Sequence, residues 1–181
     1  MLTLFSTPKQ FVGHIGVIQR SALRSWKLLH PDVEIILFGD DLAAADAARE
    51  FSIRHELYVQ CSNSGMKRLD YMFGRALAVA RHDVLCYANC DIVLTGDFHW
   101  AVKRVRAKYD HFLMAGHRWD APIVAPIDFS DSQWEEKVRQ GALSAKDRRN
   151  EWFIDYFVFP RDVYRDDRRR WWWAPFAGTT G

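Results

Sequence analysis

The chain has 181 residues, a formal net charge of +2, 49% hydrophobic and 27% charged residues, which is the composition of one globular domain with a real core. This near-neutral balance argues against nucleic acid as the main partner, and no apolar run has the length of a membrane span or the pattern of a secretion signal. Three cysteines without metal-ligand spacing (Cys61, Cys86 and Cys90) predict reduced thiols in a cytoplasmic protein.

The first strand is predicted over residues 2–6, and a helix from Gly13 to about Leu29. Between them, Thr7, Pro8 and Lys9 would lie at the carboxyl end of a strand and face a helix start. At such a place backbone N–H groups and a lysine can meet a nucleotide. A β–α loop with nothing bound fits the same residues.

A second strand is predicted over residues 33–38, followed by a helix over 42–51. Asp40 would lie at the carboxyl end of this strand, near the first loop. Its carboxylate is able to accept hydrogen bonds from a ribose or base, although a solvated turn residue is the alternative.

A short third strand over residues 53–57 and a helix from about Met66 to Arg81 come next. Basic residues in the first turn of this helix, including Lys67, suit a diphosphate, although most charges on such a helix are simply its solvated face. Asp70 would either meet the nucleotide or pair with Lys67, three residues before it.

The most informative segment is residues 83–94, an apolar strand with Asn89 and Asp91 near its carboxyl end. A run this apolar predicts a central parallel strand covered on both faces. Side chains two apart on a strand share a face, so Asn89 and Asp91 would project together. An amide and a carboxylate there are suitable ligands for Mg²⁺ or Mn²⁺ bridging to phosphates; capping of the following turn is the simpler explanation.

The remaining predicted elements are a helix over residues 100–108, a strand over 112–116, a short helix from Trp134 to about Gln140 and a strand over 153–160. Asp120 follows the first of these strands and Asp155 lies near the start of the second. We predict one domain over residues 1–164 and a charged, tryptophan-rich tail over 165–181. Trp171, Trp172 and Trp173 cannot all face one core, which predicts that some of them are exposed, contact a partner protein or pack against further chain.

Four segments taken together resemble a bacterial family of GT-A-fold glycosyltransferase-like proteins, the nucleotide-diphospho-sugar transferases. They are residues 4–9 with the helix ending Arg24-Ser25-Trp26, residues 36–40, residues 83–94 and residues 153–160. The resemblance covers residues 1–160, with Asn89-x-Asp91 standing where the family has D-x-D. It implies a mixed, mostly parallel α/β sheet flanked by helices, a nucleoside-diphosphate-sugar donor and Mg²⁺ or Mn²⁺.

Matched positions place Thr7 and Lys9 near the nucleotide, Asp40 near the base or ribose, and Asn89 with Asp91 at the metal. Asn89 removes one charge from the motif, which weakens metal binding or makes it depend on the donor's phosphates. The family continues into an acceptor-binding region after the last strand, so we expect this chain to be truncated.

The favoured function is metal-assisted transfer of a sugar to an unknown glycan, lipid or protein acceptor, with Asp155 or Asp120 as the base if the reaction inverts configuration. Retaining chemistry stays open. The alternatives are a non-catalytic nucleotide-sugar-binding or interaction module, and a nucleotidyltransferase, for which the glycine-rich lysine loop is missing.

Overall fold

A computed structural model describes residues 1–40, 42–57, 59–62, 67–145 and 154–164. Its centre is a six-stranded sheet of order β3-β2-β1-β4-β6-β5. The strands are β1 (Leu2–Ser6), β2 (Glu34–Phe38), β3 (Arg54–Glu56), β4 (Val84–Ala88), β5 (Met114–Gly116) and β6 (Tyr156–Pro160). β1 to β4 pair in parallel, and β6 runs antiparallel to both β4 and β5. The predicted mixed, mostly parallel sheet is therefore confirmed.

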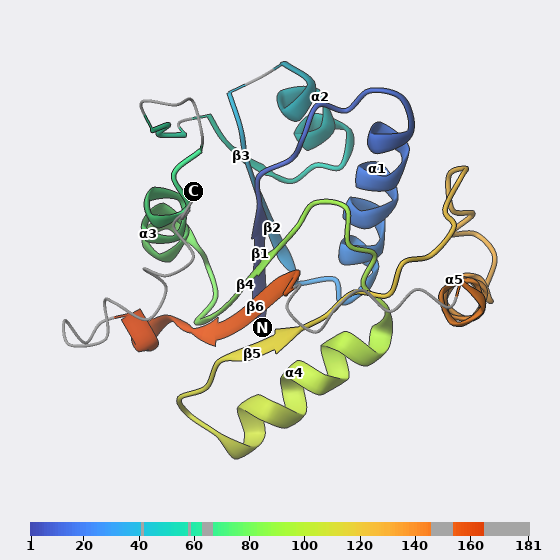
Figure 1. Cartoon of the computed structure of the whole chain (residues 1–181). Helices are drawn as coiled ribbons and strands as arrows, with labels where there is room; N and C mark the ends of the chain where they lie inside the picture. The colour runs from blue at the N-terminus through green and yellow to red at the C-terminus, as the bar shows by residue number, and fades with distance from the viewer. Residues whose placement is uncertain (41, 58, 63–66, 146–153, 165–181) are drawn as a thin grey trace, which may run out of the picture.

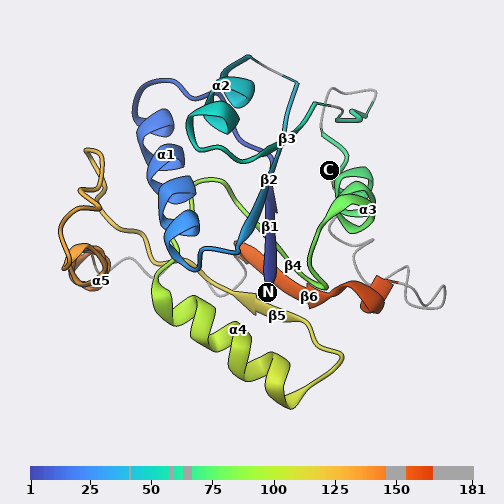
Figure 2. The same ribbon diagram turned by 180° about the vertical axis from the view of Figure 1, so that it is seen from behind.

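Helices cover both faces of this sheet (Figure 1 and Figure 2). They are α1 (Gly13–Leu28), α2 (Leu42–Glu50), α3 (Leu69–Val79), α4 (Gly96–Lys108) and α5 (Trp134–Ser144), with a 3₁₀ turn over Arg161–Tyr164. One core cluster joins Leu4 of β1 to Trp26 of α1 and Val102 of α4, and the opposite cluster joins Phe5 to Met72 of α3. Alternation along β1 thus sends successive side chains into two separate cores, as expected of a fully covered strand.

Several predicted boundaries are wrong because a hydrophobic pattern does not mark where hydrogen bonding stops. β4 ends at Ala88, so Asn89 and Asp91 lie in the loop after the strand. The third helix begins at Leu69, so Lys67 precedes it and forms an isolated bridge with Cys61. α4 starts at Gly96, before the predicted Trp100. β6 starts at Tyr156, one residue after Asp155.

Trp171–Trp173 and the rest of the predicted tail lie outside the described residues, and the division at residue 164 stays a prediction. Within the described part of the chain, no helix combines the length and apolarity that a membrane crossing requires.

Candidate functional site

The loop after β4 is held in place by α1. The indole Nε1 of Trp26 donates a 2.8 Å hydrogen bond to the Ile92 carbonyl, and the backbone N–H of Leu94 donates to Ser25 Oγ at 3.0 Å. Trp26 and Ser25 are both fully buried. Asp91, at the start of this loop, is therefore carried on a backbone that the core fixes.

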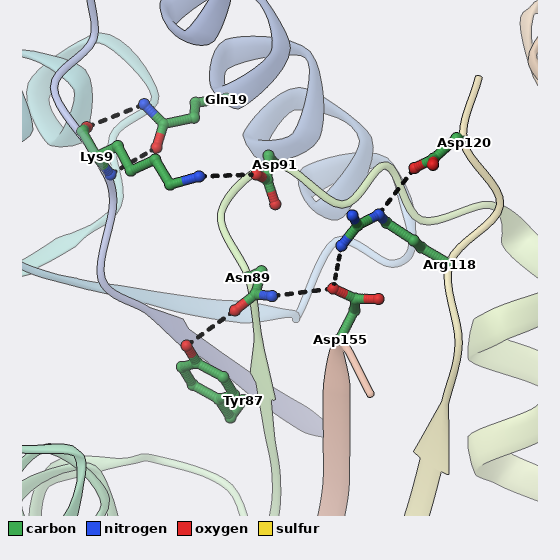
Figure 3. Close-up of polar contacts among 8 residues, drawn as sticks. All are labelled: Lys9, Gln19, Tyr87, Asn89, Asp91, Arg118, Asp120 and Asp155. Atoms are coloured by element: carbon green, nitrogen blue, oxygen red, sulfur yellow. Dashed lines mark hydrogen bonds and ion pairs between the residues drawn. The ribbon is translucent and has the colours of Figure 1, made fainter. Parts of the chain in front are cut away.

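Lys9 and Asp91 meet where β1 and β4 end (Figure 3). The two strands are parallel neighbours, so their carboxyl ends share one edge of the sheet. Lys9 Nζ lies 3.7 Å from Asp91 Oδ2, and the side chains are 71% and 38% exposed. The backbone of Lys9 exchanges two hydrogen bonds with the side chain of buried Gln19, at 2.7 and 3.0 Å. Its main chain is fixed while its ammonium group faces solvent.

Lys67 also contacts the loop that follows β1. Its Nζ donates to Thr7 Oγ1 at 2.9 Å and to the Pro8 carbonyl at 3.4 Å. The structure thus brings together Thr7, Pro8, Lys9 and Lys67, four of the predicted nucleotide contacts. The proximity of Lys67 to Thr7, 60 residues earlier, has no signature in the sequence.

Two other predicted contacts stand apart. Asp70 pairs with Arg68 rather than with Lys67, and its hydrogen bond from Arg68 Nε spans 3.1 Å. The hydrogen bond from Arg68 holds the pKa of Asp70 below its usual value. Asp40 is exposed and follows the end of β2, which is the strand next to β1.

A polar cluster joins β4, β6 and β5 beside this edge (Figure 3). Asn89 Nδ2 donates to Asp155 Oδ1 at 3.0 Å, and Arg118 Nη1 donates to the same oxygen at 2.7 Å. Arg118 Nε also donates to Asp120 Oδ1 at 2.9 Å, a hydrogen bond that raises the pKa of Arg118. Asp155 is only 3% exposed, and its Oδ2 has no hydrogen-bond partner among the described residues.

Tyr87 completes this cluster from within β4. Its hydroxyl donates to Asn89 Oδ1 at 3.0 Å. Burial, together with the negative charges of Asp91 and Asp155, raises the pKa of Tyr87 to about 12. Sequence analysis missed Tyr87 and Gln19, which look like ordinary strand and helix residues. No role was predicted for Arg118 either.

These residues fit a divalent cation only in part. The described residues contain no group of three or more His, Cys, Asp and Glu side chains that could hold a metal ion. Both the oxygen and the nitrogen of the Asn89 side-chain amide already have hydrogen-bond partners. Of the two residues in the motif, Asp91 is therefore the one whose carboxylate is left to bind a metal ion. One carboxylate suits Mg²⁺ or Mn²⁺ that keeps its waters and is shared with substrate phosphates, and does not suit an ion held by protein alone.

A cavity of about 670 Å³ opens next to Asp91. Its walls come from residues 91–95, the start of α4, residues 117–121 and the inner side of α5. Tyr156 of β6 lies at its base against Gly116, where a Cβ atom would come within 2.1 Å of the tyrosine hydroxyl. Arg118 and Asp120 both face this cavity. The space is within the range of small-molecule sites.

Comparisons with known proteins support the fold. The chain matches no protein-family model and no curated protein sequence. Among solved structures it resembles 4-diphosphocytidyl-2C-methyl-D-erythritol synthase from Anaerococcus prevotii, with a TM-score of 0.55 and 12% identity over 100% of this chain and 78% of that one. This is a nucleotide-diphospho-sugar transferase-like fold. At this identity the likeness concerns the architecture alone.

Two further structures are more distant. CMP:2-keto-3-deoxy-manno-octonic acid synthetase complexed with CTP gives a TM-score of 0.48 and 13% identity, over 91% of this chain and 76% of the other. The galactosyltransferase LgtC, in complex with donor and acceptor sugar analogues, gives 0.44 and 13%, over 94% of this chain and 60% of the other.

Proposed function

We propose that this chain binds a nucleoside-diphosphate sugar and transfers the sugar to an acceptor. The observation that carries the proposal is the juxtaposition of Lys9 and Asp91, 3.7 Å apart at the ends of parallel β1 and β4, beside a cavity that begins at Asp91. Ligands of open α/β sheets bind at this edge.

The donor would lie over the ends of β1 and β2. Lys9 would supply an exposed ammonium group for the diphosphate, and half-buried Lys67 would supply a second ammonium group, which donates a hydrogen bond to Thr7. The exposed carboxylate of Asp40, beyond the neighbouring strand, would accept hydrogen bonds from the ribose or base. A donor phosphate would compete with Asp91 for Lys9, and Asp91 would then be available to a phosphate-bound cation.

Asp91, with the donor's phosphates, would hold Mg²⁺ or Mn²⁺. When bound, such an ion supplies charge neutralisation for the leaving diphosphate. In the transfer, the acceptor hydroxyl oxygen bonds to the anomeric carbon, and the bond from that carbon to the phosphate oxygen breaks. The nucleoside diphosphate leaves with the bonding electrons, and a base takes the hydroxyl proton.

The geometry favours Asp120 over Asp155 as that base. Asp120 lines the cavity and its side chain is 32% exposed. Asp155 is buried between Asn89 and Arg118, where an acceptor hydroxyl does not reach it without displacing the cluster. Asp155 is then a positioning residue, which fixes the arginine that contacts Asp120.

One observation favours a second candidate, a non-catalytic nucleotide-sugar-binding module. Arg118 contacts both candidate bases, so each of these carboxylates is already engaged in an ion pair. A chain that binds donor without turnover is consistent with this pairing.

The two candidates separate in one experiment. UDP- and GDP-sugars with Mn²⁺ are given to the parent chain, to Asp91→Asn and to Asp110→Asn, and thermal shift and nucleoside-diphosphate release are recorded. Asp110 precedes β5, at the opposite edge of the sheet, and is a matched control. The enzyme predicts release that falls on the order of 100-fold in Asp91→Asn and is unchanged in Asp110→Asn. Thermal stabilisation without nucleoside-diphosphate release supports the binding module. If neither stabilisation nor release is observed, both candidates are refuted.

A further inference from the structure

We infer that the 670 Å³ cavity between α4, α5 and residues 117–121 takes an uncharged glycoside with an apolar substituent, and that this glycoside is the acceptor. The assignment of the acceptor role rests on the proposed function. The chemistry of the ligand follows from the cavity itself.

Hydrogen bonds and ion pairs hold the walls of this cavity together. Glu135 Oε1 of α5 accepts a 3.0 Å hydrogen bond from the backbone N–H of Gly96, the first residue of α4. Arg139 Nη1 of α5 lies 3.2 Å from Asp97 Oδ2 of α4. These two contacts join α5 to the start of α4 and close the outer wall. The inner wall, through Ile92 and Phe98, belongs to the buried core.

Both arginines that line this cavity within the described part of the chain are already paired with carboxylates. Among the described residues that line it, the arginines are Arg118 and Arg139. Arg118 contacts two carboxylates, Asp120 and Asp155, at 2.9 and 2.7 Å. Arg139 also contacts two, Asp97 at 3.2 Å and Glu136 at 3.6 Å. An anionic ligand such as a sugar phosphate would therefore meet carboxylates at both arginines and would find neither guanidinium group unpaired.

Carboxylates and a hydroxyl group suit a ligand rich in hydroxyl groups. Asp91, Asp97, Asp120 and Thr95 are among the residues that line the cavity, and their side chains carry acceptor oxygens. Much of the rest of the lining is apolar, and on and before α5 it includes Ile123, Val138, Ala142 and Leu143. A sugar ring with an aryl or alkyl substituent matches this lining, because its hydroxyl groups can donate to the acids while its substituent contacts apolar side chains such as those of α5.

The test uses p-nitrophenyl glucoside and p-nitrophenyl galactoside as uncharged probes and glucose 1-phosphate as the anionic one, with binding followed by ligand-observed NMR on the whole chain without nucleotide. The uncharged probes are expected to bind at least about tenfold more tightly than glucose 1-phosphate. Ala142→Trp, which fills the cavity from α5, is expected to weaken the uncharged probes about tenfold or more. Gln140→Trp, at an exposed residue of the same helix, is expected to leave the affinity for the uncharged probes unchanged.

A variant that removes one negative charge from the cavity tests why anionic ligands are disfavoured. Asp97→Asn leaves Arg139 with Glu136 alone, and is expected to raise the affinity for glucose 1-phosphate several-fold relative to the parent. Tighter binding of glucose 1-phosphate than of the glycosides by the parent chain, or equal glycoside binding by Ala142→Trp, overturns the inference. If nucleotide stabilises the chain but no glycoside binds, this inference is overturned and the proposed function is not. If glycosides bind but nucleotide has no effect, the proposed function is refuted and the inference about the ligand's chemistry is retained.

Discussion

Asn89 donates its amide hydrogen to Asp155, across 66 residues of sequence, at 3.0 Å. The backbone N–H of Asn89 also donates to the Asp155 carbonyl at 3.0 Å, so the pair extends the β4–β6 ladder beyond the last residue of β4. The amide in the N-x-D motif is thus a structural link between two strands. The second position, Asp91, is the one that faces outward to Lys9.

This role predicts that restoring the acidic form of the motif harms the fold. In Asn89→Asp, a carboxylate replaces the donor to buried Asp155 and places two acids side by side. We expect a loss of about 3 kcal/mol in the free energy of unfolding, measured by urea denaturation at neutral pH. Gln133→Glu makes the same chemical change at an exposed residue and is expected to alter stability by under about 0.5 kcal/mol. An unchanged midpoint together with tighter Mn²⁺ binding would show that Asn89 is a metal ligand instead.

Arg118 and Asp155 should be energetically coupled. Arg118→Met leaves the Asp155 carboxylate buried without its cation, which we expect to lower the free energy of unfolding by about 3–5 kcal/mol. In Arg118→Met/Asp155→Asn the buried charge is gone, and the loss should be smaller than the sum of the two single losses by about 1–3 kcal/mol. Urea denaturation of the four proteins gives this difference directly. Additive losses would mean that the ion pair does not hold the cluster together.

Lys9 should matter for anion binding and little for stability. Its ammonium group is 71% exposed, and its backbone bonds to Gln19 do not depend on the side chain. Lys9→Met is expected to weaken UDP or GDP binding about tenfold at low salt, by calorimetric titration, and to leave the melting temperature in the absence of nucleotide within about 1 °C. Lys108→Met, at the far end of α4, is the control. Equal weakening in both variants would indicate a general effect of charge.

The raised pKa of Tyr87 predicts that the folded chain loses stability at alkaline pH. Burial raises its pKa to about 12 from the ordinary 10.0, so the folded chain holds the phenolic proton more tightly than the unfolded chain. The stability that this difference contributes is complete below pH 10 and is lost as the pH rises from 10 toward 12. Tyr87→Phe should flatten the decline in melting temperature over this range and cost about 1 kcal/mol at neutral pH through the lost bond to Asn89. Tyr109→Phe, at an exposed residue, should leave the decline unchanged.

The parts of the molecule that the sequence predicts well are those governed by local patterns. The apolar runs at residues 2–6 and 84–88 become adjacent central strands, and the amphipathic pattern after Gly13 becomes α1. The strand pattern predicted Thr7, Lys9 and Asp91 at the carboxyl ends of two strands, and in the structure they lie after parallel neighbours β1 and β4.

What the sequence did not predict depends on pairs that are distant in the chain. The link from Lys67 to Thr7 and that from Arg118 to Asp155 join separate loops, and neither spacing carries a periodic signal. The end of β4 at Ala88 was also missed, because the apolar run continues through Ile92, Val93 and Leu94 after the sheet hydrogen bonds stop. Hydrophobic runs report burial, and in this loop burial continues beyond the strand.

The insertion of β6 between β4 and β5 sets the order in which the two halves of the molecule can assemble during synthesis. Strands β1 to β4 are complete once residue 88 has been made, and they already form the parallel half that carries Lys9. β5 borders β6 alone in the sheet, and residues 156–160 of β6 emerge from the ribosome some 40 residues after it. The parallel half that carries Lys9 can therefore form before β6 is made, whereas β5, which precedes Arg118 and Asp120, has no strand of the sheet to pair with until then.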